Sequence, residues 1–108
     1  MRTFLCPYLK GEVELTEERE AHISRTHPDL LPEYLVQIGQ TLAEPDQVQR
    51  SIRMNAARMF CRWFAEVRQG KYVVVVVASE GAPRERHRSI TAYITRRLTQ
   101  GEMEWHRN

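Results

Sequence analysis

The chain has 108 residues, of which 42% are hydrophobic and 28% charged, and its formal net charge is +2. These ordinary proportions predict one small globular domain over residues 1–108 and argue against disorder. No apolar run approaches the roughly 20 residues that a membrane-spanning helix needs, and the N-terminal apolar stretch is too short for a signal peptide. We therefore expect no membrane partner, with a cytoplasmic location as the default.

The charge is unevenly distributed along the chain. Residues 1–46 carry four basic and nine acidic side chains, a net charge of −5, whereas residues 47–108 carry twelve basic and five acidic ones, a net charge of +7. Fourteen of the sixteen cations are arginines, whose planar guanidinium grips phosphate with two parallel hydrogen bonds. The basic half predicts an anionic ligand such as RNA. A general preference for arginine, with solvated charges, accounts for the same composition.

The first half of the chain predicts two helices. Residues 4–15 show only short extended signals, broken by a proline and a turn. Thr16 is the expected N-cap of a helix that runs to about Arg25, because carboxylates in the first turn favour the positive end of the helix dipole. Pro28 ends that helix. Apolar residues at helical spacing predict a second helix over residues 31–42.

The second half predicts strands. Residues 47–53 alternate weakly, residues 71–78 hold a β-branched run typical of a central strand, and residues 89–97 alternate apolar and polar side chains. Residues 56–67 fit a helix by period, but their aromatic content and the turn after them favour a strand. The expected fold is α+β, with two N-terminal helices packed on a four-stranded antiparallel sheet that runs as a meander.

Candidate catalytic side chains gather first at the end of the first helix, at His22, Arg25 and His27. Imidazole and guanidinium groups can move a proton and hold a phosphate without a metal. The histidines are five residues apart, so they do not share one helical face as a metal-binding pair would. Purely structural roles stay open, with His22 at a helix end and His27 capping carbonyls in a loop.

The second candidate segment is the last predicted strand, which carries Thr91, Tyr93, Arg96 and Arg97. Alternation puts Arg97 on the face of Tyr93, but Arg96 takes that place if the strand ends at Thr95. Both arginines could equally be edge charges that discourage aggregation, and Tyr93 a rim aromatic residue. Residues 84–88, before this strand, are expected to form a solvated loop that could also follow a nucleic-acid backbone.

The two cysteines, Cys6 and Cys61, are far apart and lack the spacing of a zinc site, so we expect reduced thiols, no metal and no cofactor. Cys61 lies in an apolar run and is expected to be a small core residue.

Short motifs in a characteristic order resemble the phage-type branch of the barnase–EndoU–colicin–RelE-like nucleases over residues 13–105. They are Leu15-Thr16-Glu17-Glu18-Arg19, His22-Ile23, Arg25, His27-Pro28-Asp29, Thr41-Leu42, Pro45-Asp46-Gln47-Val48, Gly70-Lys71-Tyr72-Val73-Val74-Val75-Val76 and Thr91-Ala92-Tyr93-Ile94-Thr95-Arg96-Arg97. Asp29 stands where the family pattern has Glu, and Ser89 where a bulkier residue is common.

The resemblance implies N-terminal helices on a four-stranded antiparallel sheet, and for toxin relatives a metal-independent cleavage of RNA by 2′-hydroxyl attack. The family's helix motif falls on His22, Arg25 and His27. Its last-strand polar face falls on Thr91, Tyr93 and Arg96 or Arg97.

Our main hypothesis is therefore a toxin-like endoribonuclease. His22 or His27 would take the 2′-hydroxyl proton, and the other histidine or Tyr93 would protonate the leaving oxygen. Arg25 and Arg97, or Arg96, would hold the phosphate, and a histidine base predicts a bell-shaped pH profile near neutrality.

Two alternatives stay open. The first is a non-catalytic module that binds nucleic acid or a partner protein, with steeply salt-dependent RNA binding. The second is an intact toxin held by an antitoxin or immunity protein, which toxicity on expression, relieved by a neighbouring gene, would reveal. Self-association into a homo-oligomer also stays open.

Overall fold

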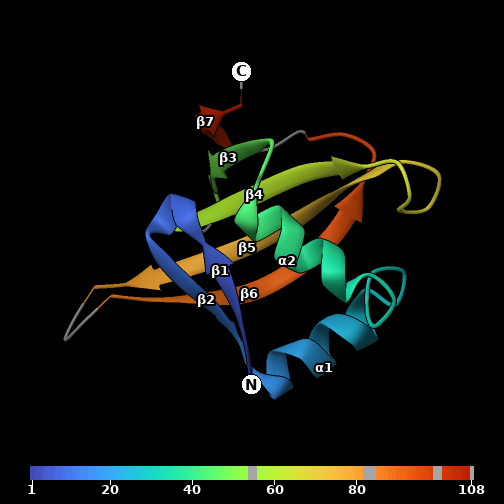
Figure 1. Ribbon diagram of the computed structural model, residues 1–108, viewed down its shortest axis with the longest axis horizontal. Helices are drawn as coiled ribbons and strands as arrows, with labels where there is room; N and C mark the ends of the chain where they lie inside the picture. Colours follow the sequence, from blue (N-terminus) through green and yellow to red (C-terminus); the bar gives the residue numbers. More distant parts are fainter. Residues whose placement is uncertain (54–55, 82–84, 99–100, 108) are drawn as a thin grey trace.

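In the computed structural model, which describes residues 1–53, 56–81, 85–98 and 101–107, seven strands form one mixed sheet with two α-helices (Figure 1). The elements in chain order are β1 (Arg2–Cys6), the 3-10 turn η1 (Pro7–Leu9), β2 (Gly11–Leu15), α1 (Glu17–Thr26), α2 (Leu35–Ala43), β3 (Gln47–Arg50), β4 (Ala57–Phe64), β5 (Lys71–Glu80), β6 (Arg86–Thr95) and β7 (Glu102–His106). The sheet order is β1-β2-β6-β5-β4-β3-β7. All neighbours are antiparallel except β2 and β6, which are parallel.

The α+β class is confirmed, whereas the four-stranded sheet is wrong. Strands β3 to β6 do form an antiparallel meander, and the segment that was ambiguous between helix and strand is β4. The β1–β2 hairpin extends the sheet beyond β6, and β7 extends it beyond β3. These added strands have five residues each, and their pairing depends on neighbours distant in sequence. Their own residue pattern therefore signals them weakly.

The helices begin and end for local reasons. The side chain of Thr16 caps α1 by accepting a hydrogen bond of 3.2 Å from the amide of Arg19, as the sequence predicts. Helix α1 ends at Thr26, close to the expected end. Helix α2 begins at Leu35, four residues later than expected, because residues 28–34 form turns.

The two faces of the sheet differ in what packs on them. The main core lies between the sheet and the helices and includes Val73, Val75 and Val77 of β5, so we call this side the helix face. The opposite side, the open face, carries a smaller buried cluster of Ala57, Met59, Cys61, Val74 and Val76. Strand β5 is buried on both sides and lies inside the sheet, so the prediction of a central strand over residues 71–78 is confirmed. Cys6 and Cys61 are free and buried, and the core position expected for Cys61 is confirmed.

Two residues between β6 and β7, on either side of positions 99–100, contact the open face. Leu98 packs on the open-face cluster, and Gly101 approaches Met59 so closely that a Cβ there would lie 2.6 Å from its methyl carbon. This segment leads from β6 to β7 on the far side of the sheet.

A bulge in β6 decides which side chains reach the open face. Ser89 pairs with Val77, and Thr91 with Val76, so Ile90 is an extra residue in the ladder. Since a bulge of one residue inverts the alternation, His87 and Ser89 share the side of Val77, the helix face. Thr91 and Tyr93 pair with Val76 and Val74, whose side chains belong to the open face.

Candidate functional site

The end of α1 meets β6 at the edge of the open face. The rings of His27 and Tyr93 lie with their centroids 6.1 Å apart, at an interplanar angle of 39°. His27 follows the last residue of α1, where its backbone amide still donates to the carbonyl of Ile23. Because Ile23 is fully buried, the helix end is held firmly, and an imidazole is fixed beside the phenol.

Tyr93 is a partly buried phenol with a perturbed ionisation. Its hydroxyl donates to the sulfur of Met59 over 3.9 Å. Burial raises the pKa of Tyr93 above its ordinary value, the neighbouring Cys61 adds to this effect, and the positive charge of Arg53 opposes it. The phenol is protonated at neutral pH, as an ordinary tyrosine is, and burial makes it a weaker acid than an exposed one.

Arg53 is the site residue that sequence reasoning missed. It follows β3, is exposed, and its charge acts on the Tyr93 phenol. Nothing in its local sequence signals this, because only the tertiary fold brings its loop towards β6. With Arg53 included, the site offers an imidazole that can accept a proton, a phenol that can donate one and a guanidinium for an anion.

The other predicted residues of the last strand lie around this pair. Thr91 is two residues before Tyr93 on the same side of β6. Arg96 and Arg97 are exposed just beyond Thr95, where β6 ends. The hydroxyl of Thr95 donates to the Arg97 carbonyl over 2.9 Å and accepts from its amide over 3.3 Å. A turn therefore replaces the alternation, and both arginines stay available.

His22 and Arg25 are placed differently. Both are exposed on α1, and their side chains form no hydrogen bond or ion pair with any residue that the structure describes. The structure places His27, and not His22, against Tyr93.

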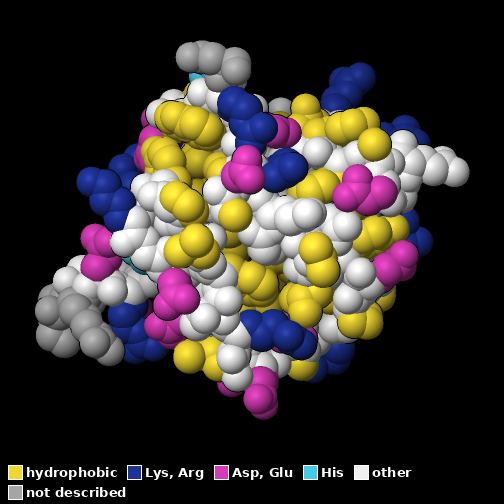
Figure 2. Space-filling view, viewed as in Figure 1, with side chains coloured by type: hydrophobic (Ala, Val, Ile, Leu, Met, Phe, Trp, Pro, Cys, Tyr) yellow, Lys and Arg dark blue, Asp and Glu magenta, His cyan; other side chains and the backbone are white. Residues whose placement is uncertain are grey.

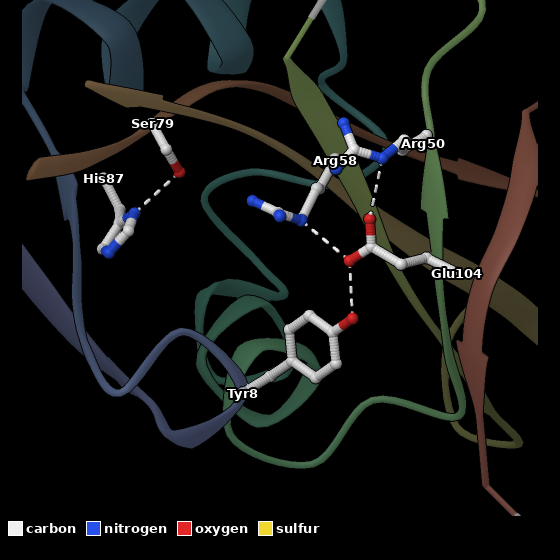
Figure 3. A network of polar contacts seen from close by, with 6 residues as sticks. All are labelled: Tyr8, Arg50, Arg58, Ser79, His87 and Glu104. Carbon is white, nitrogen blue, oxygen red and sulfur yellow. Dashed lines mark hydrogen bonds and ion pairs between the residues drawn. The ribbon is translucent and has the colours of Figure 1, made fainter. Parts of the chain in front are cut away.

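A second polar cluster, on the helix face, was not predicted. Figure 3 shows the Tyr8 hydroxyl and two guanidinium groups converging on the carboxylate of Glu104. Its Oε2 accepts from Tyr8 over 2.5 Å and from Arg58 over 2.8 Å. Its Oε1 lies 3.1 Å from Arg50 Nε, an ion-pair distance without hydrogen-bond geometry. The cluster joins η1, β3 and β4 to β7.

Ionisation in this cluster is coupled. Burial raises the pKa of Tyr8, the hydrogen bond to Glu104 raises it further, and it reaches about 12. Burial opposes ionisation of Glu104, but the hydrogen bonds from Tyr8 and Arg58 and the charges of both arginines outweigh it and lower the pKa of Glu104. The carboxylate is thus charged and engaged at neutral pH, which suits a structural clamp.

A third polar group surrounds His87, and here the predicted solvated loop is wrong. Strand β6 begins at Arg86 and buries His87, while residue 84 lies outside the described residues. The Nδ1 of His87 lies 2.7 Å from the Ser79 hydroxyl, and its Nε2 lies 3.1 Å from a Glu85 carboxylate oxygen. The ring also faces Gly11 of β2. The contact with Ser79 links His87 to β5, and the ring lies against β2, which pairs with β6 at this residue.

The basic half of the sequence does not form a continuous basic patch on the helix face. Figure 2 shows basic, acidic and hydrophobic side chains mixed over that side. Ion pairs such as Arg86–Glu14 and Arg68–Glu33 join the basic half of the chain to the acidic half. Arg53, Arg96 and Arg97, by contrast, form no ion pair with the part of the chain that the structure describes.

Comparison with protein-family models, with curated protein sequences and with solved structures finds no match for this chain. Within the described ranges, no three His, Cys, Asp or Glu side chains are grouped so that they could hold a metal ion. None of the helices in those ranges has both the length and the apolar character needed to cross a bilayer.

Proposed function

We propose that the protein is a metal-independent endoribonuclease of the toxin-like kind, with its site at His27 and Tyr93 on the open face. The supporting observation is the 6.1 Å separation of the two rings. That separation is well inside the roughly 10 Å within which two groups can serve one phosphate, given the hydrogen-bond reach of proton transfer.

The chemistry assigns one role to each group. His27 accepts the proton of a ribose 2′-hydroxyl, whose oxygen then attacks the adjacent phosphorus. Tyr93, whose phenol carries its proton at neutral pH, gives that proton to the leaving 5′-oxygen. The products are a 2′,3′-cyclic phosphate and a free 5′-hydroxyl. Arg53 with Arg97, or Arg96, stabilises the extra negative charge on the phosphate during the transfer.

This assignment chooses between the alternative roles that the sequence left open for the candidate residues. His27 becomes the preferred base because it lies against Tyr93, and Arg53 joins the phosphate-binding residues. His22, Arg25 and Thr91 remain predicted contributors to RNA contact around the site. The family resemblance, the RNA substrate and an antitoxin or immunity partner remain predictions that agree with this proposal.

The test is RNA cleavage by purified protein in EDTA, with detection of 2′,3′-cyclic ends. We expect His27→Gln and Tyr93→Phe to lower the cleavage rate by about 100-fold or more, the usual effect of losing a general base or acid. His22→Gln should have a smaller effect than His27→Gln. The matched controls are His106→Gln, on the exposed edge strand β7, and Tyr34→Phe, at the start of α2.

Two outcomes would contradict the proposal. If the wild-type protein yields no cyclic ends from either structured or unstructured RNA, it is not a nuclease of this kind. If His27→Gln and Tyr93→Phe cleave as fast as the controls, the activity lies elsewhere.

A further inference from the structure

An aromatic row crosses the open face at the end where β6 stops. Trp63 of β4 pairs with Tyr72 of β5, and Tyr72 pairs with Thr95 of β6. Trp63 shares the alternation of Cys61, and Tyr72 packs on the open-face cluster, so both rings belong to this side. Adjacent strands are about 4.8 Å apart, so the two aromatic residues are neighbours on β4 and β5, and Thr95 continues the row on β6.

Trp63 is an exposed aromatic side chain that is nevertheless held in position. It is 49% exposed. A Cβ on Gly70 would lie 2.8 Å from Cζ2 of its indole, so the backbone of the β4–β5 turn rests against the six-membered ring. The amide of Trp63 also donates to the Asp46 carboxylate over 2.8 Å. A ring fixed on one side and open on the other loses little freedom when a planar ligand stacks on it.

Two exposed arginines follow the β6 end of this row, whereas the Asp46 carboxylate lies at the backbone of Trp63. Arg96 and Arg97 follow Thr95 directly and form no ion pair with the described residues. Tyr93 of the proposed cleavage site is two residues before Thr95 on the same side of β6, about 7 Å away. Aromatic rings next to unpaired arginines are the combination with which proteins bind single-stranded nucleic acid.

We infer that Trp63 and Tyr72 form a nucleobase-stacking subsite for single-stranded RNA beside the cleavage site. This inference rests on the proposed function and names its substrate class. Stacking needs the free face of an unpaired base, so a duplex cannot use the row. The subsite tolerates any base, because every base has a π-face.

Fluorescence tests this directly, since Trp63 and Trp105 are the two tryptophans of the sequence. In a Trp105→Phe background, Trp63 is the sole indole. The probe is a short single-stranded RNA with 2′-O-methyl groups, which removes the attacking hydroxyl. We expect saturable quenching of Trp63 by this RNA, and little quenching by the same sequence as a duplex or by a strand with abasic positions.

Affinity gives the second readout. Trp63→Leu should weaken binding of the single strand about tenfold, the low-to-middle range for one stacked base. Trp63→Phe keeps a ring and should weaken it only a few-fold, while Trp105→Phe alone should leave the affinity unchanged. Each variant is checked by urea unfolding, so a folding defect is recognised.

The possible results separate the two proposals. If RNA binds without quenching Trp63 and Trp63→Leu binds normally, the stacking subsite is wrong, whereas cleavage by His27 and Tyr93 can still hold. If quenching is seen with no cleavage, the subsite stands and the nuclease proposal fails. If no RNA binds in low salt, both are overturned.

Discussion

Among individual residues, Tyr93 and Glu104 show how burial and neighbouring charges set opposite ionisation states. Burial dominates at Tyr93, so the phenol holds its proton more tightly and the pKa rises. At Glu104 the hydrogen bonds from Tyr8 and Arg58 and two positive charges outweigh burial, and the pKa falls. At neutral pH the Tyr93 phenol therefore keeps its proton, whereas the Glu104 carboxylate remains a charged anchor.

The lowered pKa of Glu104 predicts how the free energy of unfolding changes with pH. Its pKa is lower in the folded than in the unfolded chain, so its contribution is present above the unfolded pKa and is lost as the pH falls through the folded value. Glu104→Gln should lower the free energy of unfolding by about 2 kcal/mol at pH 7, because it weakens hydrogen bonds to a charged group. Urea unfolding at several pH values measures this.

The pH series provides the discriminating comparison. The difference in the free energy of unfolding between the wild-type protein and Glu104→Gln should shrink as the pH drops below about 4.5, where carboxylates ordinarily protonate. Glu102→Gln, an exposed position on the same strand, should change the stability little at any pH. A gap that stays constant down to low pH would show that Glu104 does not carry the proposed ionic contribution.

Within the secondary structure, α1 connects a local sequence signal to the candidate site. The Thr16 cap fixes where the helix begins, and the helix length then sets where His27 meets Tyr93. The signal that starts α1 is therefore also the signal that places the imidazole.

Thr16→Ala removes this cap. We expect the free energy of unfolding to fall by about 1 kcal/mol, the usual cost of losing a threonine N-cap. Thermal unfolding measures the effect, with Thr26→Ala at the exposed end of the same helix as the control. An equal loss from both substitutions would mean that the cap hydrogen bond contributes nothing specific.

The sequence predicts the elements whose signals are local. The capped helix, the central valine strand and the meander from β3 to β6 follow from hydroxyl, proline and alternation patterns. The hairpin β1–β2, the parallel pairing of β2 with β6 and the edge strand β7 depend on contacts between distant residues. The same holds for the Ile90 bulge, which changes the side chains that share a face.

In the candidate site, too, some residues are signalled by local sequence patterns and others are not. The sequence singled out the helix-end histidines and the strand that carries Tyr93, but it left open whether the fold brings these segments together; the structure places His27 beside Tyr93. Arg53 and the Glu104 cluster were missed, because single arginines and glutamates give no signal until the fold positions them.

Across the whole molecule, the arginines differ in whether an acidic side chain neutralises them. Ion pairs engage Arg50, Arg58, Arg68, Arg86 and Arg88, whereas Arg53, Arg96 and Arg97 have none among the described residues. Arg19, Arg25, Arg62 and Arg107 likewise form no ion pair with the described residues, so the arginines without an ion pair are not confined to the proposed site.

This distribution predicts the salt dependence of RNA binding. The logarithm of the affinity should fall linearly with the logarithm of salt concentration, and Arg53→Gln or Arg97→Gln should each reduce the slope by about 0.7, as for one phosphate contact on a single strand. Arg68→Gln, whose guanidinium pairs with Glu33, should leave the slope unchanged. Binding that is equally tight in low and high salt would contradict an electrostatic interface.

The hydrogen bond between Tyr8 and Glu104 joins residues separated by 96 positions. During translation, Tyr8 has no Glu104 to donate to, and β3 keeps an unpaired edge, until β7 has been synthesised. The hairpin and the helices can form before β7 is synthesised. A polypeptide that ends before residue 102 would leave the edge of β3 unpaired and Tyr8 without its acceptor, so we expect it to aggregate and to be degraded by proteases.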